Sequence, residues 1–179
     1  EVLIAPDYDS EALEILSKKQ NLRVLKSPEI IKPAESSKDI KKVVGGVLYQ
    51  DSDNTSDEDF EDYKVATKKQ PSSEEIETLK LAWKICKNVK SNAIVYAKDG
   101  STGGIGAGQM NRLDSSRIAA RKSDDAAKMI KLEEPLAVGS VVASDAFFPF
   151  ADGLMAAADA GVTAIIQPGG SIRDDEVIE

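Results

Sequence analysis

The sequence predicts an α/β protein whose central sheet is mixed. Short apolar runs alternate with segments in which apolar residues recur every three or four positions. Residues 138–167 read as strand, helix and strand, the pattern of a right-handed βαβ crossover between parallel strands. Asp99-Gly100 stands between two strand-like runs and predicts a hairpin, which joins antiparallel strands. Parallel and antiparallel pairing together give the mixed sheet.

Composition sets the broad class. With 179 residues, 41% apolar and 30% charged, the chain is long enough for a hydrophobic core. Its apolar runs are too short for a membrane span, and no signal peptide opens it. The single cysteine, Cys86, excludes an internal disulfide and favours a reducing, cytoplasmic location. Because the chain begins at Glu1 without methionine, we expect it to be a piece of a longer protein.

Charge and the lack of histidine exclude several functions. A net charge of -8 argues against nucleic-acid binding, which requires clustered cations. Residues 84–131 nevertheless hold ten Lys and Arg against four Asp, a balance of +6 that either faces an anionic small molecule or is a solvated helix surface. There is no histidine, so this chain cannot supply a Ser-His-Asp triad or a Cys-His pair. A histidine general base would have to come from elsewhere.

In the first half, strands are predicted over residues 2–5, 22–25 and 43–50, the last with a bulge or close approach at Gly45-Gly46. A helix begins at Asp9 or Ser10, and residues 27–40 form a surface connection. The apolar residues that this helix should turn inward are Leu13, Ile15 and Leu16.

The acidic segment 51–62, DSDNTSDEDFED, begins like a calcium-binding loop. The EF-hand pattern requires glycine at its sixth position and glutamate at its twelfth, where this chain has Ser56 and Asp62. An acidic surface loop is the favoured interpretation.

The clearest helix follows Pro71. Ser72 and Glu75 fit a capping box. A buried stripe at three- and four-residue spacing then predicts a core role for Cys86 rather than a reactive one. The stripe comprises Ile76, Leu79, Trp83, Cys86 and Val89.

Strands over 93–97 and 102–105 flank the predicted hairpin and lead into the glycine run 104–108. This run breaks the G-x-G-x-x-G pattern and contains no Walker sequence. Its missing side chains let either another backbone or a ligand come close. Asn92, just before the first strand, is either a turn residue or a carboxamide presented to a ligand. A helix over 114–130 follows, with Ile118, Ala119, Ala126 and Met129 inward.

Three of the four phenylalanines lie within ASDAFFPFADG, residues 143–153, after a predicted strand over 138–143. Pro149 prevents a regular strand or helix there, and Asp152 is placed to cap a helix over 152–160. A strand over 162–167, the tight loop 168–171 and a helix from Asp174 complete the chain. Ligands of such sheets gather at the carboxyl ends of strands. The rings therefore either fill a core or form an aromatic wall against a flat ring.

Five segments together closely resemble one family. They are EVLIAPDYDSEALEIL (1–16), SNAIVYAKDG (91–100), GIGAGQMNR (104–112), GSVVASDAFFPFADG (139–153) and VTAIIQPGGSIRDDEVI (162–178). They resemble the carboxyl-terminal, AICAR transformylase part of the bifunctional purine biosynthesis family, which also contains IMP cyclohydrolase. The resemblance covers nearly the whole chain. It implies transfer of a formyl group from 10-formyltetrahydrofolate to AICAR ribotide, in a cytoplasmic homodimer.

For the fold, the resemblance implies a three-layer α/β/α lobe of cytidine-deaminase-like type. Residues 1–179 are identified as the second of two such lobes, truncated at its C-terminal end. The Lys-His motif that carries proton transfer in the family belongs to the other lobe, so the isolated chain should be inactive. The alternative is a noncatalytic nucleotide- or folate-binding or interaction module that keeps the fold.

The resemblance also implies a set of site residues. The AICAR contacts are Asn92, Arg112 and Phe147, with Asn92 in a supporting role in catalysis. The folate pocket is lined by Leu113, Pro149, Phe150, Asp152 and Gly153. A structural potassium ion is implied near Ile85, Val89, Ser91, Ala93 and Asp145. Zinc is not expected, since the H-x-E and P-C-x-x-C signatures of zinc deaminases are missing. Ala151 stands where relatives usually carry arginine.

Overall fold

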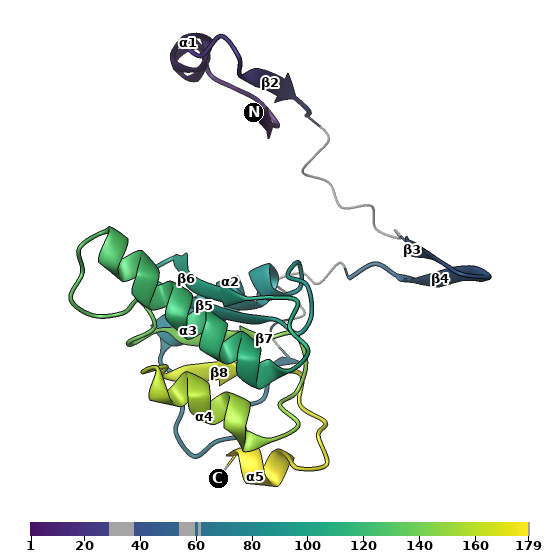
Figure 1. The fold of residues 1–179 in the computed structure, drawn as a ribbon, viewed down its shortest axis with the longest axis vertical. Helices are drawn as coiled ribbons and strands as arrows, with labels where there is room; N and C mark the ends of the chain where they lie inside the picture. Colours follow the sequence, from purple (N-terminus) through teal and green to yellow (C-terminus); the bar gives the residue numbers. More distant parts are fainter. Residues whose placement is uncertain (29–37, 54–59, 61, 179) are drawn as a thin grey trace. The chain divides into compact units, whose positions relative to one another are not determined.

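A computed structural model describes residues 1–28, 38–53, 60 and 62–178. The chain divides into two compact units, Glu1–Asn54 and Thr55–Glu179, which we describe separately. Helices and strands alternate along the chain, and the larger unit contains a mixed four-stranded sheet (Figure 1). The predicted α/β class with a mixed sheet is therefore confirmed.

The first unit begins with a small βαβ arrangement. Strands β1 (Val2–Ala5) and β2 (Arg23–Lys26) pair in parallel and are joined through helix α1 (Ser10–Ser17). The Asp9 carboxylate caps α1 by accepting a hydrogen bond from the Ala12 N–H at 2.6 Å, as the sequence predicts. The second strand begins and ends one residue later than predicted.

The inward placement predicted for the apolar residues of α1 is wrong for two of the three. Leu13 and Ile15 are 46% and 58% exposed, Leu16 is half-buried, and α1 has no buried residue. The spacing correctly predicts a helix. Two short strands and two helical turns are, however, too little structure to enclose its apolar side chains.

Residues 38–51 form a hairpin rather than one strand with a bulge. Strand β3 (Lys38–Val43) pairs in antiparallel register with β4 (Gly46–Asp51), and the predicted 43–50 strand spans the turn between them. Gly45 takes a positive φ of 83°, so these glycines reverse the chain. The predicted connection 27–40 ends inside β3, and its residues 29–37 lie outside the described residues. Of the acidic segment, 54–59 and 61 also lie outside them, so the calcium alternative is untested.

In the second unit, the sheet has the strand order β6-β5-β7-β8. Strands β5 (Ile94–Lys98) and β6 (Ser101–Gly106) form the predicted hairpin, with Asp99 and Gly100 at φ of 50° and 74°. Strand β5 also pairs antiparallel with β7 (Val141–Ser144), which in turn pairs in parallel with β8 (Ala164–Ile166). The predicted βαβ unit is confirmed, although both of its strands are shorter than predicted.

Helix α2 (Ser73–Cys86) covers one face of this sheet. The capping box is present: the Ser72 hydroxyl accepts from the Glu75 N–H, and the Glu75 carboxylate accepts from the Ser72 N–H at 2.7 Å. Leu79 and Cys86 are buried against the sheet, and the other predicted stripe residues are partly buried. Burial raises the pKa of the Cys86 thiol to about 12, with a smaller contribution from the Asp145 carboxylate. Cys86 is thus the inert core residue that was predicted.

Three helices lie on the opposite face: α3 (Arg112–Met129), α4 (Ala151–Asp159) and α5 (Asp174–Ile178). Residues of all three pack with Ile94, Tyr96 and Val142 in a second core cluster. The sheet is therefore enclosed between two helical layers, with α3 and α4 in front of it in Figure 1.

Three details of these helices differ from prediction. Helix α3 begins two residues early because Asn111 caps it, accepting from the Asp114 N–H at 2.7 Å. Met129, predicted to face inward, is 85% exposed at the last turn, where the helix extends past the sheet. Helix α4 has Phe150 as its N-cap with no side-chain cap, so the capping role predicted for Asp152 is wrong. Its carboxylate accepts from the Gly153 N–H instead.

The glycines of β6 let α3 approach the sheet closely. A Cβ atom at Gly104 or Gly106 would collide with the carbonyl oxygens of Ala119 and Ser115, one turn apart on α3. The sequence left open whether this glycine run lets a backbone or a ligand come close. At Gly104 and Gly106 it is the backbone of α3 that comes close. This packing brings the first residue of α3, Arg112, against the ends of β5 and β7.

Candidate functional site

The carboxyl end of β7 carries the clearest concentration of polar contacts in the second unit. Arg112 opens α3, Asn92 precedes β5, and Asp145 follows β7 directly. The chain places these residues 20 and 33 positions apart, and the sheet order β6-β5-β7 brings them together. The peptide bond Ser91-Asn92 is cis.

Arg112 is the centre of this group. Its Nη2 donates to Asp145 Oδ1 at 2.9 Å, and its Nη1 donates to the Asn92 side-chain oxygen. Its Nε donates to the Ser144 hydroxyl and to the Ala146 carbonyl, at 3.1 and 3.2 Å. The Arg112 side chain is only 10% exposed and that of Asp145 16%. A charge pair this far from solvent is held in one geometry by its hydrogen bonds.

Asn92 is fixed from both ends of its carboxamide. Its oxygen accepts from Arg112, and its Nδ2 donates to the Gln109 carbonyl at 2.8 Å. Its backbone is held as well, because the Ser115 hydroxyl donates to the Asn92 carbonyl at 2.7 Å. The amide therefore has a defined orientation before any ligand arrives. The Asn92 side chain contacts residues 17 and 20 positions away rather than a local turn, and the presented carboxamide stays a prediction.

Asp145 connects this group to the sheet. The same Oδ1 that accepts from Arg112 also accepts from the Ala93 N–H at 2.8 Å, at the start of β5. Among the five residues predicted near a potassium ion, Ala93 and Asp145 are thus in direct contact. Ile85 and Val89 are half-buried and Ser91 is exposed. Within the described ranges, no group of three His, Cys, Asp or Glu is arranged to hold a metal ion.

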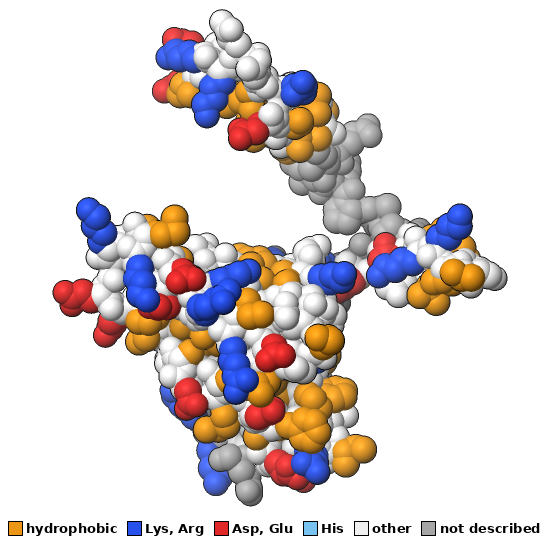
Figure 2. All heavy atoms as spheres, in the orientation of Figure 1, with side chains coloured by type: hydrophobic (Ala, Val, Ile, Leu, Met, Phe, Trp, Pro, Cys, Tyr) orange, Lys and Arg blue, Asp and Glu red, His pale blue; other side chains and the backbone are white. Residues whose placement is uncertain are grey.

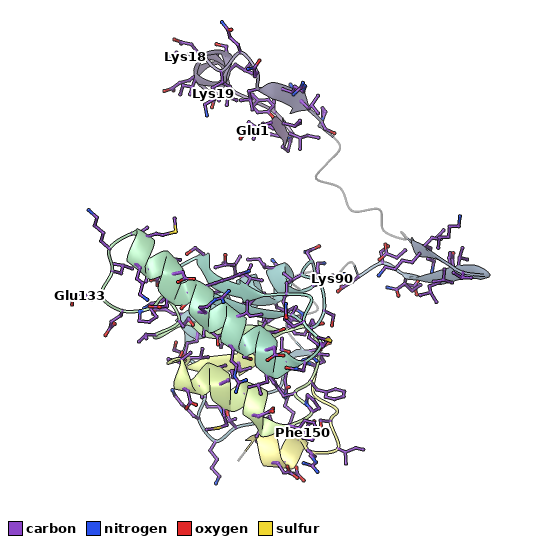
Figure 3. The ribbon with its side chains drawn as sticks, viewed as in Figure 1. Glu1, Lys18, Lys19, Lys90, Glu133 and Phe150 are labelled. Atoms are coloured by element: carbon purple, nitrogen blue, oxygen red, sulfur yellow. The ribbon has the colours of Figure 1, made fainter. Side chains whose placement is uncertain are left out.

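The phenylalanines serve two different purposes. Phe148 is fully buried in the core beneath α4, whereas Phe147 is 39% exposed and Phe150 52% exposed. The core interpretation is therefore correct for Phe148 and not for the other two. Figure 2 shows hydrophobic side chains on the surface over this end of the unit, and Figure 3 labels Phe150 where α4 begins. The Arg173 guanidinium carbon lies 5.2 Å from the centre of the Phe150 ring.

The remaining predicted folate residues differ in their exposure. Pro149 and Asp152 are exposed and Leu113 is half-buried. Gly153 is buried under the loop: a Cβ there would lie 3.0 Å from the Phe148 ring, and its carbonyl accepts from the Ser116 hydroxyl. Gly153 thus has a packing role, and its contact with a folate stays a prediction.

Sequence reasoning missed Gln167. Its side-chain oxygen accepts from the Phe148 N–H at 2.7 Å, which joins the end of β8 to the aromatic loop, residues 145–150. The position after a short apolar strand gives no signal of such a contact. Arg112 was selected, but its contacts with Asp145, Ser144 and Ala146 depend on tertiary packing.

This geometry defines an α/β module with a polar group and exposed aromatic rings at one end of a mixed sheet. The family profile described as "AICARFT/IMPCHase bienzyme" matches residues 1–122, more than half of the chain. The chain belongs to this family.

Close relatives match over almost the full chain. Proteins named bifunctional purine biosynthesis protein PurH are 57% identical over 178 residues in Parvibaculum lavamentivorans and 59% identical over 178 residues in Cereibacter sphaeroides. The corresponding protein of Agrobacterium fabrum is 56% identical over 179 residues. These matches cover 99–100% of this chain and 33–34% of each relative. The chain thus spans about a third of the length of these relatives. No described helix is long and apolar enough to cross a membrane.

The Arg112–Asp145 pair should dominate the stability of the site. Asp145→Ala would leave the Arg112 guanidinium buried without its counter-charge, so we expect a loss of about 3–5 kcal/mol in the free energy of unfolding. Urea denaturation of the chain measures this loss. Asp145→Asn also removes the charge but keeps an acceptor oxygen for Arg112 and the Ala93 N–H, so its smaller loss separates the hydrogen bonds from the charge. A change below about 1 kcal/mol for Asp145→Ala would contradict this role.

Proposed function

We propose that this chain is part of a folate-dependent formyltransferase site that acts in purine biosynthesis. The reaction transfers the formyl group of 10-formyltetrahydrofolate to the amine of AICAR ribotide. Family membership supports the class of protein. The observation that supports a site at this end of the sheet is that Phe147 and Phe150 are exposed on a loop whose Ala146 carbonyl accepts a hydrogen bond from Arg112, the residue that also holds Asn92. Residues 1–179 would then be the second, truncated lobe of cytidine-deaminase-like type, and the two helical layers around the sheet of the second unit agree with this.

The chemistry requires orientation above all. The lone pair of the AICAR amine is delocalised into the ring, so the amine is a weak nucleophile. It must be held against the formyl carbon and lose its proton. A preoriented carboxamide at Asn92 suits the first requirement, since it can contact the polar edge of the base without reorganising. Arg112 fixes that carboxamide and lies on the nucleotide side. Phe147 would lie against AICAR.

The folate would occupy the neighbouring surface. Stacking on an exposed ring contributes about 1–3 kcal/mol for a nucleic-acid base, and a pterin is similarly flat. Phe150 offers such a ring, and Asp152 is exposed two residues later. Leu113, Pro149 and Gly153 complete the proposed pocket. Asp152 is assigned to the polar edge of the pterin.

Proton transfer must come from another part of the protein. The full sequence contains no histidine, and the family's Lys-His motif is assigned to the other lobe. Phe147 and Phe150 are 39% and 52% exposed. The aromatic loop is thus an open surface, which agrees with a site completed by the other lobe and formed in a homodimer.

A potassium ion near Asp145 and Ala93 would have a structural role. The parent protein would also carry IMP cyclohydrolase.

The isolated chain should therefore show no measurable transformylase activity. Incubation with AICAR ribotide and 10-formyltetrahydrofolate, followed by the absorbance change of tetrahydrofolate formation, tests this. Turnover by the chain alone, after removal of any full-length host enzyme, would contradict the assignment of proton transfer to the other lobe.

Binding separates the formyltransferase half-site from a noncatalytic fold remnant. Phe150→Ala should weaken binding of 5-formyltetrahydrofolate, a stable folate analogue, by about tenfold while changing stability little, because half of the ring is already exposed. Calorimetric titration measures the affinity and thermal denaturation the stability.

Phe148→Ala is the matched control, since the same substitution in the core should cost about 3–5 kcal/mol of unfolding free energy. If wild-type chain binds neither 5-formyltetrahydrofolate nor AICAR ribotide, the half-site is wrong and the noncatalytic interpretation stands.

A further inference from the structure

The aromatic loop, residues 145–150, presents two rings to solvent and buries the one between them. Where Phe147 and Phe150 point therefore depends on how the backbone around Phe148 is held. Proline at 149 removes one N–H from this backbone, so few hydrogen bonds can fix it.

The β7 side of the loop is held by two contacts to one carbonyl. The Ser144 hydroxyl donates to Ala146 O at 2.7 Å, and Arg112 Nε donates to the same oxygen at 3.2 Å. On the α4 side, the loop is held by an apolar contact, because the Phe148 ring packs against Gly153. The middle of the loop is held from a third direction by Gln167, whose Oε1 accepts from the Phe148 N–H at 2.7 Å.

Gln167 is well placed to keep this contact. It is half-buried and follows β8 directly, and β8 pairs in register with β7 from Val141 to Ala143. The two strand ends are therefore fixed relative to each other, and the side chain has a rigid base. Beyond Gln167, the chain continues through Pro168 to Arg173, which lies over Phe150. Gln167 thus connects the aromatic loop with the segment 168–173, whose Arg173 lies over the Phe150 ring.

We propose that Gln167 is a positioning residue of the ligand site: its side-chain oxygen fixes the aromatic loop so that Phe147 and Phe150 present their rings in one arrangement. This proposal rests on the proposed function. A partly buried N–H without an acceptor seeks another partner, so loss of the Gln167 oxygen lets the loop rearrange. Rings that must be ordered on binding give weaker affinity than rings held in advance.

The test compares variants that keep or remove the acceptor. Gln167→Glu keeps an oxygen at the same reach, Gln167→Met fills similar space without a hydrogen-bond acceptor of comparable strength, and Gln167→Ser is too short to reach Phe148. Ile166→Val, on the same strand, lowers stability but keeps Gln167 and is the matched control. Two quantities are measured on the full chain: amide hydrogen exchange at Phe148 without ligand, and the affinity for 5-formyltetrahydrofolate by calorimetry.

We expect exchange at Phe148 to accelerate at least tenfold, and the dissociation constant to rise at least fivefold, in the Met and Ser variants. The Glu variant should stay within about twofold of wild type in both, and the Val variant within about twofold in affinity. Unchanged exchange in both loss variants, a Glu variant that behaves like them, or faster exchange with unchanged affinity would each overturn the proposal. If wild type binds no folate analogue, the proposed function fails, and the exchange rates alone decide whether Gln167 anchors the loop.

Discussion

The partly buried ion pair between Arg112 and Asp145 is the interaction on which the candidate site depends. It joins the first residue of α3 to the residue after β7, and through Ala93 it reaches the start of β5. With one side chain 10% and the other 16% exposed, neither charge has water as a ready substitute for its partner. The pair also determines the orientation of Asn92, because the same guanidinium donates to the Asn92 oxygen. The polar half of the site is thus built into the tertiary fold.

The aromatic residues of the site are arranged differently: one ring is buried and holds the loop in place, and two rings are exposed to solvent. Phe148 contributes to the core, while Phe147 and Phe150 stay accessible on either side. This arrangement explains why three phenylalanines lie together beside a proline: the buried ring fixes the backbone that carries the two exposed rings. Glycine at 153 is needed for the same reason: the Phe148 ring occupies the space where a side chain would lie.

Much of this could be predicted from the sequence, because local patterns carry it. The capping box at Ser72, the Asp99-Gly100 hairpin and the βαβ unit over 138–167 depend on short-range chemistry, and the structure has all three. The exposure of Leu13 and Ile15 could not be predicted, since spacing shows which residues share a face but not what covers it. The contacts of Arg112 and Gln167 escaped prediction because their partners are brought close only by the order of strands in the sheet. Asp152 was assigned a cap from its position alone, and the structure gives it a different bond.

We propose that the loop after β7 is an open ligand surface beside Asn92. The most direct measurement is titration of the ¹⁵N-labelled chain with 5-formyltetrahydrofolate and AICAR ribotide while its amide resonances are followed by NMR. We expect shifts at residues 147, 148 and 150–153 for the folate and near Asn92 for the ribotide, with α1 and the β3–β4 hairpin unaffected. Shifts confined to the first unit, or none at saturating ligand, would contradict it.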